Sequence, residues 1–217
     1  MTKKKSIETC RVVLCYDINR AINVDIFKEV IQLINAACVI FYNSEHDEAA
    51  LQKAAEPLVK IAQEQGAAAL IADDSRIAGR LKADGIHIIA KGHDINDVIS
   101  HTNGQIIIGI GEIKDRHTAM EIGEKNPDYL MFGKLGADKT PTAHPRNLAL
   151  ATWWAQMMEV PTIVQAGATL ASVEEAAASG AEFVAVEEAL FASNDILENA
   201  KEINAITQKY ILTDASF

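Results

Sequence analysis

The sequence predicts an α/β protein with one domain, a single (β/α)8 TIM barrel that extends over residues 1–217. Three observations predict this fold. Short apolar runs occur eight times along the chain, an amphipathic stretch follows each run, and no linker rich in Pro, Ser or Gly divides the sequence. Eight strand–helix units are what closes a parallel barrel, and such barrels place their active sites at the C-terminal ends of the strands. The residues that follow each run are therefore the candidate functional residues.

The eight apolar runs are the predicted strands. They are rich in Val, Ile, Leu and Ala with little polar alternation, which is typical of parallel strands covered on both faces. An open doubly wound sheet is the alternative, but eight repeats and the absence of a Gly-x-Gly-x-x-Gly turn favour a closed barrel. The runs begin at Arg11, Cys38, Ala67, Gly85, Gln105, Tyr129, Pro161 and Phe183.

The stretches between the runs are predicted helices, because their apolar residues recur at helical spacing. Thr169 is a good N-cap, and Gly66 and Gly180 stand where helices end. The fourth helix has the weakest pattern and is expected to be only a turn or two. The predicted helical ranges are 24–36, 47–65, 75–82, 94–101, 114–125, 146–158, 169–179 and 195–209.

Charge and composition exclude several classes of protein. A formal net charge of −10 argues against a nucleic-acid partner, whose phosphates need a basic surface. No stretch approaches the roughly 18 consecutive apolar residues of a membrane span, so no membrane partner is expected. The basic start leads into no apolar segment and is expected to be a flexible tail over residues 1–9. Three cysteines without metal-ligand spacing indicate reduced thiols and a cytoplasmic protein.

Acidic residues follow the third and eighth runs. Asp73 and Asp74 could hold a divalent cation through carboxylate oxygens, although Asp74 could equally cap the next helix. His87 lies inside the fourth run, which favours a hydrogen-bonded interior histidine over a general base. Glu187 and Glu188 would repel a phosphate if their side chains pointed inward.

The sixth and seventh runs end in residues suited to binding and proton transfer. Lys134 directly follows Phe132-Gly133, and a lysine desolvated at a strand end can have a lowered pKa and act as an acid/base. A solvated or ion-paired lysine is the alternative. The loop over residues 135–144 is the longest of the strand-end connections, and long loops often form lids. Gly167 precedes a helix, where backbone N–H groups can bind an anion.

Several segments carry a resemblance over roughly residues 10 to 200. In order and content the chain resembles the thiamine phosphate synthase family, which includes its relative, the thiazole tautomerase TenI. The family's corresponding segments read like D-G-V-H, I-I-G, A-D-Y-x-x-F-G and I-P-V-V-A-I-G-G. Here they are Asp84-Gly-Ile-His87, Ile107-Ile-Gly109, Pro127-Asp-Tyr-Leu-Met-Phe-Gly133, and Val160-Pro161 through Gly167 to Ala181-Glu-Phe-Val-Ala-Val186.

The resemblance implies a synthase that joins a pyrimidine diphosphate to a thiazole phosphate, with Mg²⁺ assisting the departure of diphosphate. By resemblance Asp73 falls on a metal ligand of the family, and the second metal carboxylate falls near Gly92. Other positions depart from the family. Its basic diphosphate-binding stretch falls on Ile40, Tyr42, Asn43 and Ser44, and its Thr-x-Thr-Lys loop falls on Asp138, Lys139, Thr140 and Pro141.

These departures replace basic or phosphate-facing groups by neutral or acidic ones, so the sequence predicts a divergent family member that binds a small polar or phosphorylated heterocycle. If it is catalytic, we expect proton transfer with Lys134 as acid/base, because the tautomerase has a histidine at this position. Two alternatives stay open, a non-catalytic binding or scaffold barrel and an active synthase with a rearranged site. A homodimer is left open as well. The predicted ligand-binding residues are Glu112 and Gln165, which orient the ligand, Gly167, which presents backbone donors, and Lys139 and Thr140, which close over it.

Overall fold

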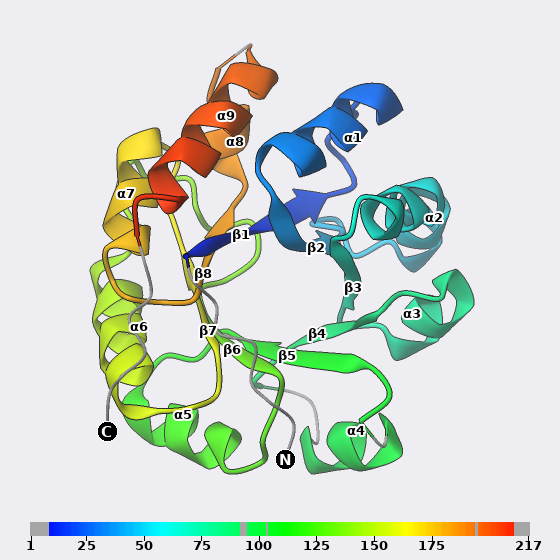
Figure 1. Ribbon diagram of the computed structural model, residues 1–217. Helices are drawn as coiled ribbons and strands as arrows, with labels where there is room; N and C mark the ends of the chain where they lie inside the picture. The colour runs from blue at the N-terminus through cyan, green and yellow to red at the C-terminus, as the bar shows by residue number, and fades with distance from the viewer. Residues whose placement is uncertain (1–8, 92–94, 103, 194, 211–217) are drawn as a thin grey trace.

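The computed structural model describes residues 9–91, 95–102, 104–193 and 195–210. Within them eight parallel strands form a closed barrel in chain order, so the predicted (β/α)8 barrel is confirmed. The helices lie around the strands as an outer ring (Figure 1). The strands are β1 (Arg11–Asp17), β2 (Ala36–Tyr42), β3 (Ala68–Ala72), β4 (Gly85–Ile89), β5 (Ile107–Gly111), β6 (Tyr129–Phe132), β7 (Thr162–Gln165) and β8 (Phe183–Val186).

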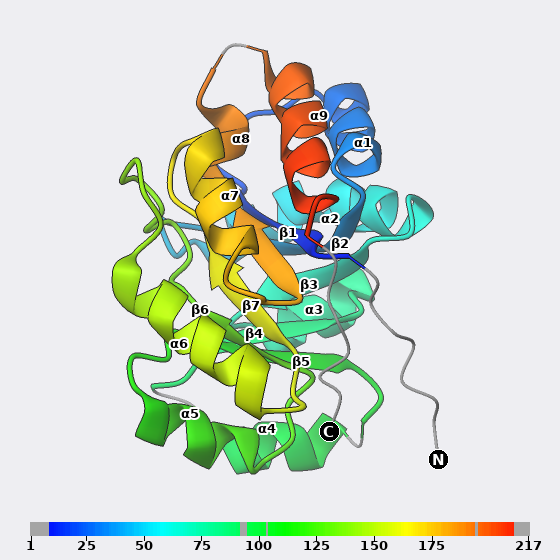
Figure 2. The same cartoon turned by 60° about the vertical axis from the view of Figure 1, so that its left-hand side comes forward.

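The barrel closes because β1 pairs with both β2 and β8. Val12 lies opposite Ala36 on one side and Val184 on the other. Figure 2 shows α7, α8, α9 and α1 following one another around this part of the barrel. The helices are α1 (Val24–Leu33), α2 (Glu48–Glu64), α3 (Ser75–Leu81), α4 (Ile95–Thr102), α5 (Arg116–Gly123), α6 (Pro145–Met157), α7 (Leu170–Ala177), α8 (Glu188–Phe191) and α9 (Ile196–Thr207).

Side-chain caps fix where most of these helices begin. Asn23, Asp47, Asp74, Asp115 and Thr169 each accept a hydrogen bond from a backbone N–H in the first turn of the following helix. Such caps satisfy donors that have no partner within the helix. The predicted N-cap Thr169 is confirmed. Each cap also ends a βα loop, so it helps to set the shape of the barrel mouth.

The hydrophobic core has two layers. Inside the barrel, side chains such as Cys15, Ile40, Leu70 and Met131 fill the lumen and are almost completely buried. A larger layer lies between the strands and the surrounding helices. All three cysteines are buried free thiols, as the odd number indicated. The barrel is therefore a packed core, and a ligand has access only at its ends.

The observed ends of several elements differ from the predicted ones by one to three residues, and two differences concern the barrel mouth and the sheet most directly. The first helix ends at Leu33 and β2 begins at Ala36, two residues before the predicted start, because Asn35 adopts a left-handed conformation (φ 50°). That conformation stops the helix and turns the chain into the sheet. The short helix α8 after β8 was not predicted, since the pair Glu187-Glu188 was interpreted only as a strand end.

His87 is an interior histidine, as the apolar run around it indicated. It is buried, and its Nδ1 lies 2.9 Å from the hydroxyl of Tyr129. A Cβ atom at Gly109 would lie 1.8 Å from the Tyr129 ring, so glycine makes the room for that ring. Burial lowers the pKa of His87 to about 4, which keeps the imidazole neutral at physiological pH.

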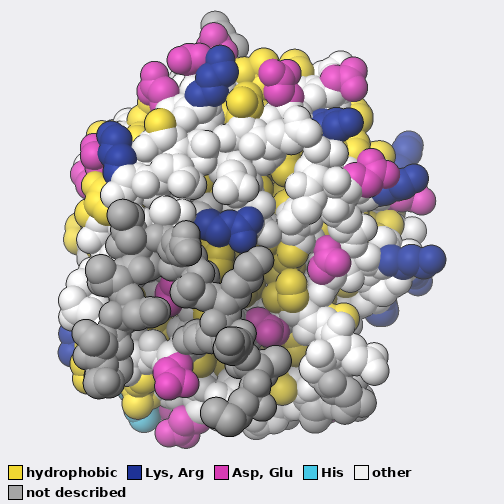
Figure 3. Space-filling view, in the orientation of Figure 1, with side chains coloured by type: hydrophobic (Ala, Val, Ile, Leu, Met, Phe, Trp, Pro, Cys, Tyr) yellow, Lys and Arg dark blue, Asp and Glu magenta, His cyan; other side chains and the backbone are white. Residues whose placement is uncertain are grey.

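The surface carries charges of both signs. On the face shown in Figure 3, Lys and Arg side chains are scattered among Asp and Glu and form no continuous basic patch. None of the helices in the described ranges combines the length and apolar character that crossing a bilayer requires.

Candidate functional site at the C-terminal ends of the strands

The mouth of the barrel at the strand C-termini divides into two parts with different properties. The first, which we call the open pocket, is a cavity of about 270 Å³ at the ends of β5, β6 and β7. The second, which we call the closed corner, lies at the ends of β1, β2 and β8 and is filled by hydrogen-bonded polar side chains. Residues of the open pocket used below are Glu112, Lys134, Asp138, Thr140, Arg146 and Gln165.

The open pocket carries an ion pair formed by two predicted residues. Lys134 Nζ lies 3.6 Å from Glu112 Oε1, and the side chains are 63% and 23% exposed. Lys134 follows β6 and Glu112 follows β5, so adjacent strand ends bring them together. Glu112 adopts a left-handed conformation (φ 58°), which is unusual for a residue with a Cβ atom and concentrates at functional sites. Lys134 is therefore exposed and ion-paired, which is the alternative that the sequence left open, and the pair lines the pocket where a ligand can meet it.

Gln165, at the end of β7, positions the backbone that carries Lys134. Its side-chain oxygen accepts from the N–H of Lys134 at 2.8 Å, and its side-chain nitrogen donates to the carbonyl of Lys134 at 2.7 Å. A Cβ atom at Gly133 would lie 2.5 Å from the Gln165 Cβ atom, so this pairing requires glycine there. The structure thus gives buried Gln165 a positioning contact, whereas its predicted contact with a ligand stays a prediction.

The loop that follows Lys134 packs onto the end of β7. The N–H of Ala168 donates to the Thr140 carbonyl at 2.7 Å, and the N–H of Gly167 donates to the Ser172 hydroxyl at 2.9 Å. Gly167 was predicted to present a backbone donor to a ligand, but in this conformation its N–H is already paired within the chain. A Cβ atom at Gly167 would lie 2.5 Å from two loop carbonyl oxygens, those of Thr140 and Thr142. Glycine is needed here for the close approach of the loop.

The two predicted closing residues differ in position. Thr140 lines the open pocket, and its hydroxyl donates to the Thr142 carbonyl at 3.0 Å. Lys139 is exposed and is not among the residues that line the pocket. Whether the pair closes over a ligand stays a prediction.

Glu187 is the centre of the closed corner. It is 1% exposed and accepts hydrogen bonds from the Tyr42 hydroxyl at 2.7 Å and from Arg20 Nε at 3.0 Å. Burial raises the pKa of Glu187 to about 7, although Tyr42 and Arg20 both favour the ionised form. Burial and this same carboxylate hold the pKa of Tyr42 well above its usual range. The closed corner is therefore a desolvated network with a single carboxylate at its centre.

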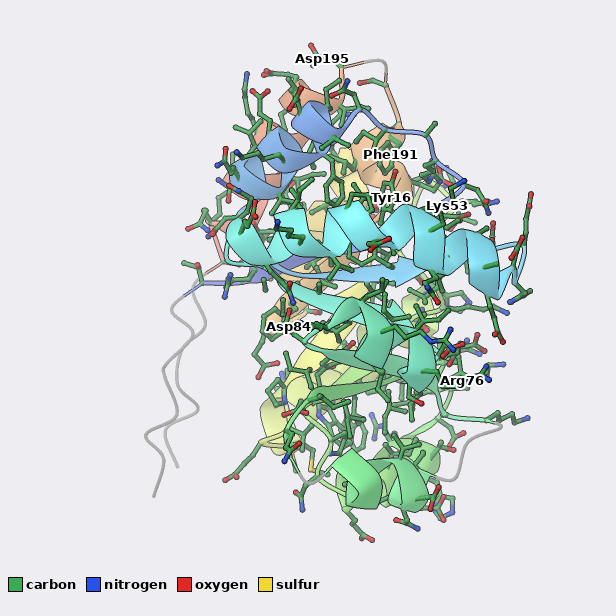
Figure 4. All side chains as sticks on the ribbon, turned by 90° about the vertical axis from the view of Figure 1, so that its right-hand side faces the viewer. Tyr16, Lys53, Arg76, Asp84, Phe191 and Asp195 are labelled. Carbon is green, nitrogen blue, oxygen red and sulfur yellow. The ribbon has the colours of Figure 1, made fainter. Side chains whose placement is uncertain are left out.

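Arg20 anchors the network to α8. It also forms an ion pair with Glu188, and its guanidinium lies 4.8 Å from the centroid of the Phe191 ring. Tyr16 packs against the same ring, with centroids 6.4 Å apart, and the two residues are labelled close together in Figure 4. The arginine is thus held by both charge and ring contacts, which suits a planar guanidinium.

Asp138, from the loop after β6, connects the two parts of the mouth. It lines the open pocket and is 3% exposed. Its Oδ2 accepts from the N–H of Glu188 at 2.8 Å, while its Oδ1 is buried without a hydrogen-bond partner among the described residues. Burial raises the pKa of the Asp138 carboxyl above its ordinary value. An unpaired buried acceptor is unusual, because most buried polar atoms in folded proteins have a hydrogen-bond partner.

The acidic residues after β3, Asp73 and Asp74, each accept hydrogen bonds within the chain. Asp73 is exposed with φ 55°, and its Oδ1 accepts from the N–H of Ile89 at 3.1 Å. Asp74 caps α3 and lies 3.5 Å from Arg76, which extends outward from α3 in Figure 4. No group of three His, Cys, Asp or Glu side chains in the described parts of the chain could hold a metal ion. Of the two carboxylate positions that the resemblance implies, the described residues include Asp73, and the position near Gly92 lies outside them, so Mg²⁺ binding at Asp73 stays a prediction.

Three residues of the mouth were missed as functional candidates: Arg20, Tyr42 and Asp138. Each is a polar residue at a strand end or in the loop after it, which is the signal that could have found them. Their partners are distant in sequence, since Arg20 and Glu187 are separated by 167 positions. Only closure of the barrel between β1 and β8 brings them together.

The fold and the strand-end site define a (β/α)8 barrel with charged and polar side chains at its C-terminal mouth. The sequence profile described as thiamine monophosphate synthase matches residues 11–190, and the chain belongs to this family. It is 32% identical over 155 residues to a thiamine-phosphate synthase of Erythrobacter litoralis, covering 70% of this chain and 71% of that protein. It is 30% identical over 155 residues to a thiamine-phosphate synthase of Rhodospirillum centenum, covering 70% and 74%.

Solved structures show the same fold. Thiamine phosphate pyrophosphorylase from Pyrococcus furiosus superposes with a TM-score of 0.77 at 16% identity, covering 94% of this chain and 98% of that one. A 3-hexulose-6-phosphate synthase from Salmonella typhimurium superposes with a TM-score of 0.69 at 13% identity, covering 92% and 99%. At these identities the similarity establishes the barrel alone.

Proposed function

We propose that this chain is a divergent member of the thiamine monophosphate synthase family that binds a small polar heterocycle in the open pocket and transfers a proton to or from it through Lys134. The observation that carries the proposal is the Lys134–Glu112 ion pair at the pocket, 3.6 Å apart. Lys134 supplies or accepts the proton, and Glu112 holds the ammonium group. Gln165 fixes the backbone beneath Lys134 through two hydrogen bonds.

The closed corner supports proton transfer over displacement of a diphosphate. A diphosphate brings several negative charges, and the only cation of the closed corner among the described residues, Arg20, is already paired with Glu187 and Glu188. Asp138 adds a further carboxylate beside them. Because like charges repel strongly where water is excluded, a diphosphate would be unstable at this position.

The test is a ligand screen followed by solvent exchange. Thiazole phosphates, pyrimidines and sugar phosphates are screened for an increase in melting temperature, since a ligand that binds the native state raises apparent stability. Each ligand that binds is then incubated in D₂O, and proton exchange is followed by NMR. Lys134→Ala and Lys134→Arg are expected to slow exchange by roughly 10²–10⁴-fold, the usual contribution of general acid–base catalysis.

The arginine variant separates charge from proton transfer. Arginine keeps the positive charge but does not deprotonate in proteins, so Lys134→Arg should keep ligand binding and lose exchange. Lys60→Ala is the matched control, an exposed lysine of α2 that pairs with Glu64 at 3.9 Å outside the pocket lining, and it should change neither. Exchange at the wild-type rate in Lys134→Arg would remove Lys134 from the mechanism. Binding without exchange in the wild type would favour a non-catalytic barrel.

Synthase activity is the second candidate, and the 32% identity to a thiamine-phosphate synthase favours it. It is tested by incubating the protein with the pyrimidine diphosphate, the thiazole phosphate and Mg²⁺. Formation of thiamine phosphate above a control without enzyme establishes this candidate. Its absence, with exchange present, leaves proton transfer as the function.

A further inference from the structure

We infer that a second copy of this chain docks on the side of the barrel formed by α5 and α6, with its own α5 antiparallel to the first. Two observations carry the inference: apolar side chains are exposed where the two helices lie together, and the charges along α5 follow an order that an antiparallel copy complements. We call this surface the α5–α6 face, and its residues are not among those that line the open pocket. It consists of Arg116, Met120, Glu124, Trp153 and Met157.

The first observation is the exposed apolar side chains where α5 and α6 lie side by side (Figures 1 and 2). Met120 on α5 is 39% exposed, and Met157 on α6 is 65% exposed. The helices meet at Arg116, whose guanidinium lies 4.8 Å from the centroid of the half-buried Trp153 ring. Met120 follows Arg116 by one helical turn and Met157 follows Trp153 by one, so both methionines lie along this junction. Met, Trp and Arg are residue types that are enriched in protein–protein interfaces.

The second observation is the order of the charges along α5. Arg116 begins the helix and Glu124 is its C-cap, and both are exposed. The helix dipole favours the opposite order, with anionic groups at the N-terminus and cationic groups at the C-terminus. Between them His117 and Glu121 already pair with each other at 3.4 Å, whereas Arg116 and Glu124 form no ion pair within the described ranges. Both charges are therefore available to a partner.

Met120 lies midway between these two charges, four residues after Arg116 and four before Glu124. Residues four apart form one ridge on a helix surface, and such ridges are what commonly pack when two helices cross. Two copies related by a two-fold axis at Met120 place Arg116 opposite Glu124 of the partner subunit, and the reverse pair forms by symmetry. A two-fold interface has to be self-complementary in this way. A parallel copy would instead set like charges against each other.

The test is sedimentation equilibrium of the full chain over a concentration series, with Arg116→Glu and Glu124→Arg as variants. Each change sets two pairs of like charges against each other across the interface, so each variant should dimerise at least about tenfold more weakly than the wild type. In an equimolar mixture, every carboxylate of the first variant at these positions faces a guanidinium of the second. The mixture should therefore recover dimers that neither variant forms alone.

Both changes follow the order of charges that the dipole of α5 favours, so neither should destabilise the helix, and thermal unfolding checks this. The control is Arg80→Glu, the same charge reversal on α3, where Arg80 Nη1 donates to Gln52 at 3.0 Å. In Figure 1, α3 lies on the other side of the barrel from α5 and α6, so this variant should dimerise as the wild type does.

Four results would each overturn the inference. The wild type could stay monomeric throughout the concentration series, or the two variants could dimerise as tightly as the wild type. The mixture could fail to recover dimers, which would remove the pairing of Arg116 with Glu124 of the partner subunit. An equal loss in Arg80→Glu would assign the effect to net charge and not to the α5–α6 face.

Discussion

The two parts of the barrel mouth use charged side chains in opposite ways. In the closed corner, Glu187 is 1% exposed and bonded to Tyr42 and Arg20. In the open pocket, Lys134 is 63% exposed and lies 3.6 Å from the carboxylate of Glu112, which is 23% exposed. The buried and paired charges are held in place by the fold, while the exposed ones are available to a ligand. The difference shows that strand-end position alone does not identify a functional residue.

Breaking the closed corner should have the largest effect on stability. Replacing Arg20 by Met leaves Glu187 buried beside Asp138 without its cation, and losing one partner of a buried pair costs about 3–5 kcal/mol. The loss should be greatest at pH 8 and smaller at pH 6, because Glu187 has a pKa of about 7 and can take up a proton. Urea unfolding of the wild type and the variant at both pH values measures this loss of unfolding free energy.

Arg76→Met is the matched control for Arg20→Met. Arg76 pairs with Glu48 at 3.1 Å, but both side chains are about 70% exposed. Exposed pairs contribute about 0–1 kcal/mol, so this variant should unfold nearly as the wild type does. Equal losses of unfolding free energy in the two variants would mean that the buried pair of Arg20 contributes no more to stability than the exposed pair of Arg76.

Glu187→Gln, which removes the charge at the centre of the closed corner, should change the pH dependence of stability. We expect this effect to be similar to or smaller than the loss predicted for Arg20→Met. The pKa of Glu187 is raised from 4.5 to about 7 in the folded protein. Its neutral form is favoured by folding, so the stabilisation is fully present below pH 4.5 and is lost as the pH rises through 7. Between these values the unfolding free energy of the wild type should fall by about 3 kcal/mol relative to Glu187→Gln. Parallel curves for the two proteins from pH 4.5 to 8 would contradict this.

The contact between the loop and β7 should be sensitive to a single methyl group. In Gly167→Ala the added Cβ lies 2.5 Å from the carbonyl oxygens of Thr140 and Thr142, so the loop must move. Overpacking of this kind costs about 1–3 kcal/mol, measurable by urea unfolding. Gly79→Ala is the control, because its Cβ meets nothing within 4 Å in α3, and a helical alanine should stabilise by up to about 1 kcal/mol. If Gly167→Ala is as stable as the wild type, the loop over residues 135–144 can move away from the added methyl group without lowering the unfolding free energy.

Much of the fold could be predicted because its signals are local. Apolar runs predicted all eight strands, helical spacing of apolar residues predicted the helical ranges, and Thr169 was predicted as an N-cap and is one. The differences arise where a conformation is set by neighbours in space. Asn35 turns left-handed and β2 starts at Ala36, since that residue pairs with Val12 across the sheet.

The site was less predictable because its contacts join distant strand ends. Lys134 and Glu112 could be expected to meet, since they follow adjacent strands of a barrel. The role of Glu187 could not be predicted in this way. Glu187 follows β8, whereas its partners Tyr42 and Arg20 belong to the ends of β2 and β1, which reach it only because the barrel closes. The sequence also indicated Gly167 as a donor to a ligand, but the Ser172 hydroxyl accepts from its N–H. A local motif does not show which backbone groups the chain itself will satisfy.

The smallest predicted effect is a gain in stability, and it would sharpen the contrast between the two parts of the mouth. Glu112 holds φ at 58° at the open pocket, where a Cβ atom is unfavourable. Glu112→Gly should therefore raise the unfolding free energy by up to about 1 kcal/mol while weakening ligand binding. Lys82→Gly relieves an equivalent conformation (φ 54°) at the end of α3, away from the pocket lining, and should give the same gain without a change in binding. If the conformation of Glu112 serves ligand binding, both variants are stabilised but only Glu112→Gly binds the ligand more weakly. Equal ligand affinities in both variants would instead assign the conformation of Glu112 to the fold.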